Sequence, residues 1–337
     1  MQIDTAARSE CNYLDQIHNI DPAKAPETSK AWQDVIQRSE KARKPVPQVY
    51  GMDRVAAILE SANCRAKFLA SKESEELEKT LKNIVLSGRY KVLSYDVFDT
   101  LVLRNDKAEA HRYLELSERL RSRLQEENLV STADECTAED ICLARVQALQ
   151  VNYRIRKPVS GCVEGSIAEV IRIQTEILNL PEEARGLFLK EELEYEVDNL
   201  SPNPVLVSLA KEFARQGGRV VLVSDMYLDG NSIEYVVDHV LGERFHEKLF
   251  SSSDLVVSKR SGKIFKRVES DLGESPDKFI HFGDSLIGDV RRAREAGWAA
   301  QYFPVSAKEM ERREKNLDDF VKAMSAKGFD VSPWAKI

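Results

Sequence analysis

Glycine and proline are scarce in this chain, with 15 and 11 of them among 337 residues. Collagen-like and proline-rich disordered chains need far more of both, so these classes are excluded. No apolar run approaches the roughly 18 residues of a membrane-spanning helix, so we expect no membrane span. The opening residues MQIDTAARSE lack a basic patch followed by an apolar stretch, so no secretory signal is predicted.

Cysteine is equally sparse, and its spacing excludes a cysteine-based metal site. The five cysteines are Cys11, Cys64, Cys136, Cys142 and Cys162, and no two of them form a CxxC pair. An odd number of irregularly spaced cysteines is typical of reduced thiols in the cytoplasm. The net charge is −7, from 49 basic and 56 acidic residues, which argues against a general nucleic-acid binder. The composition therefore predicts a mildly acidic, cytoplasmic globular protein.

The first quarter of the chain looks different from the rest. A length of 337 residues suits about two domains, and residues 1–88 are mostly polar with helical periodicity. Apolar spacing predicts helices over 52–70 and 73–86. The KPVP at 44–47 indicates a boundary, because proline disfavours helix before and within it. We interpret residues 1–88 as an N-terminal helical extension without chemistry of its own.

Strands and helices alternate over most of the chain after residue 88. Apolar, strand-like segments occur at 91–96 (KVLSYD), 219–225 (RVVLVSD), 278–284 (KFIHFGD) and 298–303 (WAAQYF). The stretch 108–200 between the first two is helical throughout. Such alternation predicts an α/β fold with a doubly wound parallel sheet. In these sheets the functional groups lie in the crevice at the carboxyl ends of the strands.

Polar side chains stand at those strand ends. Asp96 ends the first strand, Ser224 the second and Asp284 the third. Asp289 follows Asp284 by five residues, and Lys259 lies between the second and third strands. Carboxylates gathered in one place raise one another's pKa, so positive charge must offset them. Mg²⁺ does this well with carboxylates and phosphate oxygens. Since Asp is also a competent nucleophile toward phosphorus, the pattern predicts phosphoryl transfer.

The same residues resemble the four ordered motifs of the haloacid dehalogenase-like (HAD) superfamily. Asp96-Val-Phe-Asp-Thr-Leu is similar to the first motif, and Ser224 fits the second. Lys259, in KRSGKIF, fits the third, and GDSLIGD at 283–289 followed by an alanine-rich helix fits the fourth. Each motif alone is weak, but four in the right order and at strand ends are specific.

The resemblance implies how the chain is divided. Residues 89–106 and 205–305 would form the HAD-like core, a Rossmann-type parallel sheet. The long gap between the first two motifs would hold an inserted helical cap over 107–204. Residues 306–337 would add a C-terminal helix.

The resemblance also implies roles for single residues in a phosphohydrolase acting on a small phosphorylated metabolite. Asp96 would attack phosphorus, and Ser224 and Lys259 would bind the transferring phosphoryl group. Mg²⁺ would be held by Asp96, the backbone of Phe98, Asp284 and Asp289. Candidates for contact with the substrate are Asp99, Thr100 and Arg104.

The first motif departs from the family at one position. Phe98 stands where phosphatases of this family carry the Asp that acts as general acid and base, a group typically worth about 10²–10⁴ in rate. Asp99 is adjacent, but neighbouring side chains along a strand point in different directions. Three alternatives stay open: another group or the substrate supplies the proton; the enzyme cleaves a C–P or C–halogen bond; or the domain only binds a phosphorylated ligand or partner. A C–P enzyme would need a cap lysine such as Lys107 or Lys157.

The residue sequences of the motifs are similar to those of one HAD subgroup. YDVFDTLVLR, VSDMYL and SKRSGKIF resemble proteins found beside or fused to glycosyltransferases of surface-polysaccharide biosynthesis. This implies a sugar phosphate, or a nucleotide- or lipid-linked sugar phosphate, as substrate, and glycosyltransferases as associated proteins. His281, inside an apolar strand, is interpreted as a packed sheet residue, and Asp225 as a turn residue rather than a ligand.

Overall fold

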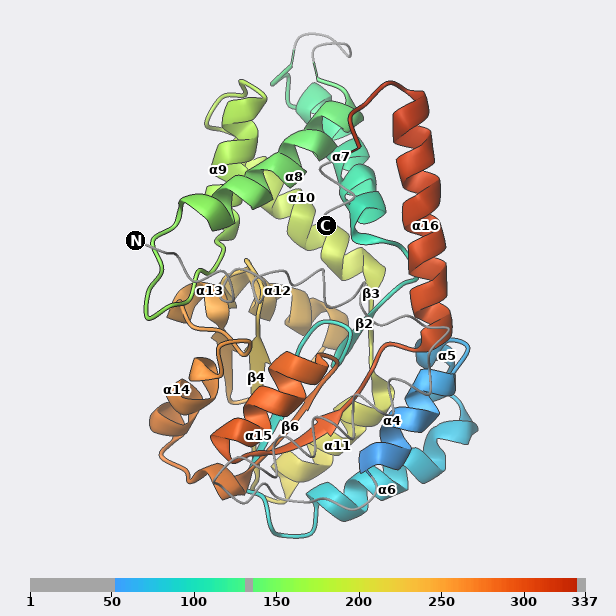
Figure 1. Cartoon of the computed structure of the whole chain (residues 1–337), viewed down its shortest axis with the longest axis vertical. Helices are drawn as coiled ribbons and strands as arrows, with labels where there is room; N and C mark the ends of the chain where they lie inside the picture. The colour runs from blue at the N-terminus through green and yellow to red at the C-terminus, as the bar shows by residue number, and fades with distance from the viewer. Residues whose placement is uncertain (1–51, 131–135, 332–337) are drawn as a thin grey trace, which may run out of the picture.

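A five-stranded sheet forms the centre of the computed structural model, which describes residues 52–130 and 136–331 (Figure 1). All pairings in this sheet are parallel, which confirms the predicted fold class. The strand order is β5 (Lys248–Ser251), β4 (Arg219–Ser224), β1 (Val92–Tyr95), β6 (Phe279–Gly283) and β7 (Ala299–Tyr302). The chain runs outward from β1 to β4 and β5, then returns to the other side of β1. The topological switch therefore lies at β1, where such sheets form their crevice.

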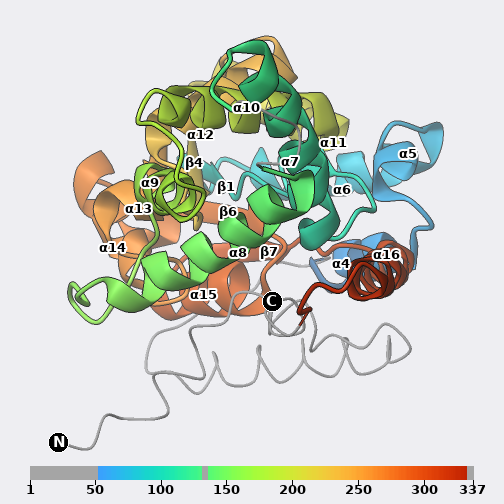
Figure 2. The same ribbon diagram turned by 90° about the horizontal axis from the view of Figure 1, so that it is seen from above.

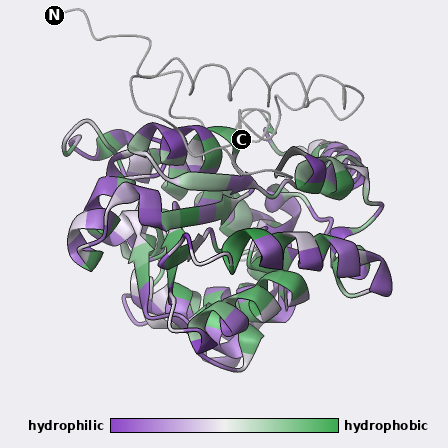
Figure 3. Cartoon of the chain, turned by 90° about the horizontal axis from the view of Figure 1, so that it is seen from below, coloured by the Kyte–Doolittle hydropathy of each residue, from purple (hydrophilic) through white to green (hydrophobic). Residues whose placement is uncertain are grey.

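The strands are buried because helices cover both faces of the sheet. Every residue of β1 and β6 is buried, as the nearly continuous apolar segments predicted. Figure 3 shows these strands as largely hydrophobic and the outer helix faces as hydrophilic. The surrounding helices are α11 (Pro204–Arg215), α12 (Gly230–Leu241), the short α13 (Ser252–Leu255), α14 (Lys263–Leu272) and α15 (Arg292–Ala296). The 3₁₀ turn η3 (Pro276–Lys278) leads into β6.

A second group of helices comes after β1 and before β4 along the chain. It consists of α7 (Glu109–Glu126), α8 (Ala138–Ile155), α9 (Ile167–Ile177) and α10 (Ala184–Asn199). Two short antiparallel strands, β2 (Val102–Arg104) and β3 (Leu200–Pro202), carry the chain into this group and out of it. Helix α8 begins with a capping box formed by Thr137 and Asp140. We call α7–α10 the cap helices.

The cap helices cover the carboxyl end of β4. Tyr227, three residues after that strand ends, donates its hydroxyl to Glu192 of α10 at 3.0 Å. The main-chain N–H of Ile167, at the start of α9, donates to the Tyr227 carbonyl at 2.7 Å. In the view from above, the cap helices lie in front of the strands (Figure 2). The crevice of the sheet therefore faces the cap.

The N-terminal helices are shorter than predicted. The expected helix over 52–70 is wrong, because the chain breaks at 62–64 between α4 (Met52–Ser61) and α5 (Arg65–Leu69). Cys64 is extended there, and the N–H of Arg65 donates to Glu309 at 2.8 Å instead of continuing the helix. A tertiary contact thus overrides the local helical preference. The turn η2 (Lys72–Ser74) and α6 (Glu75–Val85) come next, close to the predicted 73–86.

The C-terminal helix α16 (Ala307–Ala326) joins the N-terminal helices to the cap. Its far end packs Phe320 and Met324 against Tyr113 of α7 and Cys142 and Val146 of α8. Its near end contacts α4. Within residues 52–130 and 136–331, no helix has the length and apolar character needed to cross a bilayer. The KPVP at 44–47 and Cys11 lie outside the described residues.

Candidate active site

Three acidic side chains meet at the carboxyl ends of β1 and β6. Asp96 follows β1 directly, and Asp284 follows β6, the neighbour of β1. Asp289 lies in the π-helical turn η4 (Leu286–Arg291) that comes after β6. Carboxylate oxygens of these three residues lie within 4.8 Å of one another. Ser224 ends β4, the other neighbour of β1, and is buried.

Lys259 lies at the centre of this group. Its Nζ is 2.5 Å from Asp96 Oδ1 and 2.6 Å from Asp289 Oδ1, and the lysine side chain is 4% exposed. Burial alone would lower the pKa of Lys259, but the carboxylates of Asp289 and Asp96 raise it well above its usual value. Lys259 is therefore a fixed positive charge between two carboxylates.

Asp225 holds the loop that carries this lysine. Its carboxylate accepts hydrogen bonds from the main-chain N–H of Lys259 at 2.7 Å and of Arg260 at 3.2 Å. These bonds fix the backbone beside the lysine, which is the role of a turn residue expected from the sequence. Through them, the end of β4 is connected to the residue that reaches across to β1.

One lysine does not neutralise three acids, of which Asp96 and Asp289 are buried and Asp284 is partly buried. Burial raises the pKa of Asp96 to about 7, although Lys259 opposes the shift. Burial and the charges of Asp96 and Asp289 raise the pKa of Asp284 well above its usual value. Clustered carboxylate oxygens with excess negative charge are the donor set that a hard divalent cation prefers. The residues present therefore fit a Mg²⁺-sized cation.

The surroundings of the cluster agree with a polar occupant. The Thr100 hydroxyl is buried and lies close enough to Asp96 to oppose the rise in the pKa of that carboxyl. Gly283 is required by close packing, because a Cβ added there would lie 2.1 Å from Asp289 Cγ. The main-chain N–H of Ser285 donates to Asp289 Oδ2 at 2.9 Å, which fixes that carboxylate.

His281 makes contacts that the sequence did not indicate. Its Nε2 lies 3.0 Å from Asp289 Oδ1, and its Nδ1 lies 2.8 Å from Ser94 Oγ on β1. The imidazole is completely buried, as expected for a sheet residue, but it also orients an active-site carboxylate. Burial and the nearby Lys259 lower the pKa of His281, while Asp289 opposes the shift. Only the pairing of β1 with β6 reveals this role, since Ser94 and His281 are register partners.

Phe98 is covered by an arginine. Its ring is 6% exposed, and the Arg104 guanidinium carbon lies 4.3 Å from the ring centroid. Arg104 Nη2 donates to both carboxylate oxygens of Glu196 at 3.2 Å, and Arg112 approaches the same carboxylate at 3.8 Å. Arg104 thus lies beside the first motif, as the sequence suggested, in a cation–π contact.

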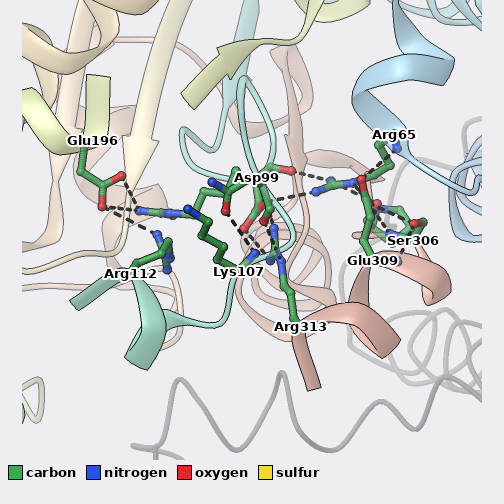
Figure 4. A network of polar contacts seen from close by, with 11 residues as sticks. Arg65, Asp99, Lys107, Arg112, Glu196, Ser306, Glu309 and Arg313 are labelled. Atoms are coloured by element: carbon green, nitrogen blue, oxygen red, sulfur yellow. Dashed lines mark hydrogen bonds and ion pairs between the residues drawn. The ribbon is translucent and has the colours of Figure 1, made fainter. Parts of the chain in front are cut away.

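Asp99 points toward a pair of arginines, Arg65 and Arg313 (Figure 4). Its Oδ1 accepts from Arg65 Nη2 at 3.0 Å and from Arg313 Nη2 at 2.7 Å. Its Oδ2 accepts from Arg313 Nη1 at 3.0 Å, and its main-chain oxygen accepts from Arg65 Nη1 at 2.7 Å. Burial would raise the pKa of Asp99, but Arg313 and Arg65 hold it well below its usual value. Asp99 is therefore an anchored anion, and contact with substrate, expected from the sequence, has no support in this geometry.

The anchor connects both ends of the described chain to the first motif. Arg65 Nε donates to Glu309 Oε2 at 2.7 Å, and Glu309 also closes the capping box of Ser306 at the start of α16. Asp99 has φ of +58°, in the left-handed region that a non-glycine residue adopts at some cost. We call Arg65, Asp99, Glu309 and Arg313 the anchor cluster. No motif pointed to its two arginines or its glutamate.

The two cap lysines considered for C–P cleavage do not join the acidic cluster of Asp96, Asp284 and Asp289. Lys107 forms an ion pair with Glu115 at 2.5 Å on an open face of the cap, lined also by Arg119 and Asn199. Lys157 is exposed in the loop after α8. Neither contacts any of the three clustered acids.

A family model for the haloacid dehalogenase-like hydrolases matches residues 90–297, more than half of the chain. The chain belongs to this family. The match begins just before β1 and ends after α15, so it includes every HAD motif residue described above. The helices that supply Arg65 and Arg313 lie outside it. The search of curated proteins gives no match.

Several solved structures are similar to this HAD chain at low identity. One is a HAD family enzyme from Bacteroides thetaiotaomicron in complex with magnesium and inorganic phosphate: 18% identity, 63% of this chain, 93% of the other and a TM-score of 0.40. A 2-haloacid dehalogenase from Pseudomonas syringae has 19% identity, 63% and 85% coverage and a TM-score of 0.43. A predicted phosphoglycolate phosphatase from Haemophilus somnus has 15% identity, 64% and 88% coverage and a TM-score of 0.36. Likenesses this remote do not discriminate between the reactions of these proteins.

Proposed function

We propose that this HAD hydrolase is a Mg²⁺-dependent phosphohydrolase that works through an aspartyl-phosphate on Asp96. The observation that carries the proposal is the position of Lys259 Nζ between Asp96 and Asp289, with Asp284 completing the acidic group. Phosphoryl transfer needs mainly positioning and neutralisation of charge, and this arrangement supplies both.

Each residue at the strand ends has a distinct task in this proposal. A carboxylate oxygen of Asp96 attacks phosphorus, and the ammonium of Lys259 and the hydroxyl of Ser224 hold oxygens of the phosphoryl group. Asp96, the main-chain oxygen of Phe98, Asp284 and Asp289 would hold Mg²⁺, which supplies positive charge toward the phosphate when bound. Water then cleaves the aspartyl-phosphate and restores Asp96.

The proposed substrate and cellular context rest on the sequences of the motifs rather than on the geometry of the site. We propose a small phosphorylated metabolite, a sugar phosphate or a nucleotide- or lipid-linked sugar phosphate, turned over in the cytoplasm beside glycosyltransferases of polysaccharide biosynthesis. In this chain Phe98 replaces the acid/base Asp of the related phosphatases. Because the protein lacks the usual proton donor at that position, we expect it to act on a narrower range of substrates, those whose leaving group needs less protonation.

Release of phosphate tests the proposal directly. We expect the full-length protein to release phosphate from at least one member of a panel of sugar phosphates, nucleotides and nucleotide sugars. The release should need Mg²⁺, stop in EDTA and be lost in Asp96→Asn, which keeps the side-chain size but removes the nucleophilic charge. The measurement is phosphate formed per enzyme with and without metal.

Two outcomes would overturn the phosphohydrolase. Release that Asp96→Asn leaves unchanged would exclude Asp96 as nucleophile. Thermal stabilisation by a panel member without any turnover would favour the binding module, the alternative that Phe98 makes worth testing.

A further inference from the structure

Phe98 and Arg104 occupy the place where a proton donor is needed. The Phe98 ring cannot transfer a proton, and the Arg104 guanidinium lies over it at 4.3 Å. A guanidinium remains protonated at any pH at which the protein is folded, so it cannot serve as an acid either. What it can do is stabilise negative charge that develops nearby.

The neighbouring Asp99 is not available as a substitute. Both of its carboxylate oxygens accept hydrogen bonds from Arg65 or Arg313, as Figure 4 shows. Its main-chain oxygen is held as well, by a second nitrogen of Arg65 at 2.7 Å. Turning the side chain toward Asp96 would take the carboxylate away from the partly buried Arg313 and leave the buried Arg65 paired with Glu309 alone, which is costly.

The acids of the cap that line the cavity beside Arg104 all have partners, and one of them, Glu109, accepts from the Tyr113 hydroxyl at 2.6 Å. This cavity, of about 10 Å³, is lined by Arg104, Arg112, Glu192 and Glu196 among others, and has room for about one water molecule. Glu196 pairs with both arginines, and Glu192 accepts from Arg145 and from the Tyr227 hydroxyl. The cavity thus presents the Arg104 guanidinium, which also covers Phe98, and carboxylates that already have partners.

From these contacts we propose that the substrate is an anhydride of phosphoric acid, whose terminal phosphoryl group leaves an oxyanion that needs no proton from the protein. The class includes phosphoanhydrides such as nucleoside or lipid diphosphates and mixed anhydrides such as acyl phosphates. Simple alkyl phosphate esters are poor substrates, because an alkoxide does not leave without protonation. The inference rests on the proposed function and narrows its substrate class.

The reaction balances without a protein acid or base. The Asp96 carboxylate forms a bond to phosphorus while the bond from phosphorus to the leaving oxygen breaks, and the electron pair departs with that oxygen as a phosphate or carboxylate anion. Water then adds to the phosphorus of the aspartyl-phosphate. Its hydroxyl stays on phosphorus, its proton stays on a phosphate oxygen, and Asp96 is released as the carboxylate. Arg104, which lies over the Phe98 ring, would attract the anionic leaving group.

One carboxyl group near the crevice offers a competing explanation. Glu164, in the loop between α8 and α9, lies beside the hydroxyls of Ser258, next to Lys259, and of Ser252, at the start of α13. Burial and the charge of Asp225 raise the pKa of Glu164 to about 7, which is suitable for a general acid. If Glu164 protonated the leaving group, alkyl esters would be substrates too.

Acetyl phosphate and ethyl phosphate separate these possibilities. The two compounds are nearly identical in size, but acetyl phosphate leaves as a carboxylate and ethyl phosphate as an alkoxide. We expect the full-length protein with Mg²⁺ to favour acetyl phosphate in kcat/KM. Phe98→Asp should reduce this preference by about 10²–10⁴-fold, the typical contribution of a positioned general acid. Phe98→Asn introduces a side chain of the same size as Asp that cannot act as an acid, so it should leave the preference unchanged.

A second series needs no variant of Phe98. Across phenyl phosphates with progressively more acidic phenols, kcat/KM of the natural protein should rise steeply with the acidity of the leaving group. Asp96→Asn serves as the blank for spontaneous hydrolysis in both series.

The outcomes are distinguishable. The anhydride proposal is overturned if the natural protein has only a small preference for acetyl phosphate over ethyl phosphate, or if Phe98→Asp leaves that preference unchanged. If Glu164→Gln then increases the preference for acetyl phosphate, Glu164 is the proton donor. No hydrolysis of acetyl phosphate above the Asp96→Asn blank overturns the proposed function instead. A steep dependence on the leaving group together with the effect of Phe98→Asp supports both.

Discussion

Lys259→Met is expected to lower the free energy of unfolding by about 3–5 kcal/mol, the usual cost of leaving buried charges without their partner. Lys259 Nζ contacts Asp96 and Asp289 at 2.5 and 2.6 Å and is nearly inaccessible to solvent. Without it the three acids would carry uncompensated charge. The midpoint of urea unfolding, measured with and without Mg²⁺, reports the loss. Added Mg²⁺ should restore more stability to the variant than to the natural protein.

The pH dependence of that loss has a definite sign. Burial opposes the shift, but Lys259 and His281 lower the pKa of Asp289 below its unfolded value, so the paired state stabilises the fold above that value. In Lys259→Met the acids would instead bind protons more readily when folded. The difference from the natural protein should therefore be largest near neutral pH and shrink as the pH falls toward 5.

Lys263→Met is the matched control for Lys259. This lysine lies four residues further on and contacts only the Ser160 carbonyl, at an exposed position. We expect its unfolding free energy to change by less than about 1 kcal/mol. An equal effect of the two substitutions, or no effect of Lys259→Met, would contradict the charge assignment at the strand ends.

Asp99→Ala is expected to lower the free energy of unfolding by about 3–5 kcal/mol, because it leaves the partly buried Arg313 without its carboxylate and removes one of the two carboxylates that pair with the buried Arg65. Arg65 is 1% exposed and Arg313 is 13% exposed at their side chains. Alanine also tolerates the left-handed backbone at this position, φ +58°, less well than Asp. Urea unfolding gives the stability. Where the variant folds, phosphate release should fall with it, because the first-motif loop loses its attachment.

Two arginines of α16 provide the matched pair for the anchor cluster. Arg313→Met removes two hydrogen bonds to Asp99, whereas Arg312→Met removes contacts of a more exposed side chain with Asp106 at 2.6 Å and with the Asn63 main-chain oxygen at 2.6 Å. Surface ion pairs contribute about 0–1 kcal/mol, so Arg312→Met should be close to the natural protein. Similar losses in both variants would mean that the anchor cluster is no more important than surface charge.

The site residues that the sequence predicted are those fixed by strand ends. Asp96, Ser224 and Asp284 each follow or end an apolar run, and parallel strands bring their carboxyl ends to one edge. The chain order of the motifs then placed Lys259 and Asp289 beside them. For these residues local pattern and global topology agree, so sequence reasoning was sufficient to bring them together.

The anchor cluster was not predictable in this way. Arg65 lies 34 residues before Asp99, and Arg313 lies 214 residues after it, in helices that show only ordinary amphipathic spacing. The same limitation explains the failed helix over 52–70, since its break depends on Glu309. His281 had a correct burial prediction but an unseen partner, because its contact with Asp289 depends on strand register and on η4.

The helices outside the family match gain a role from these contacts. Arg65 from α5 and Arg313 from α16 hold the residue next to Phe98, and the far end of α16 packs on the cap helices α7 and α8. The additions therefore connect the first motif to the cap. In the proposed mechanism, this attachment keeps Asp99 from transferring a proton.

The central claim is that Asp96 accepts the phosphoryl group. Because Phe98 cannot activate water, we expect the phosphorylated form to persist long enough to be trapped. The full-length protein would be mixed with acetyl phosphate and Mg²⁺, quenched in acid during turnover, digested and examined by mass spectrometry. The account predicts one added phosphoryl group on the peptide containing Asp96, and none in Asp96→Asn. Turnover with Asp96 unmodified, or with the phosphoryl group on another residue, would contradict it.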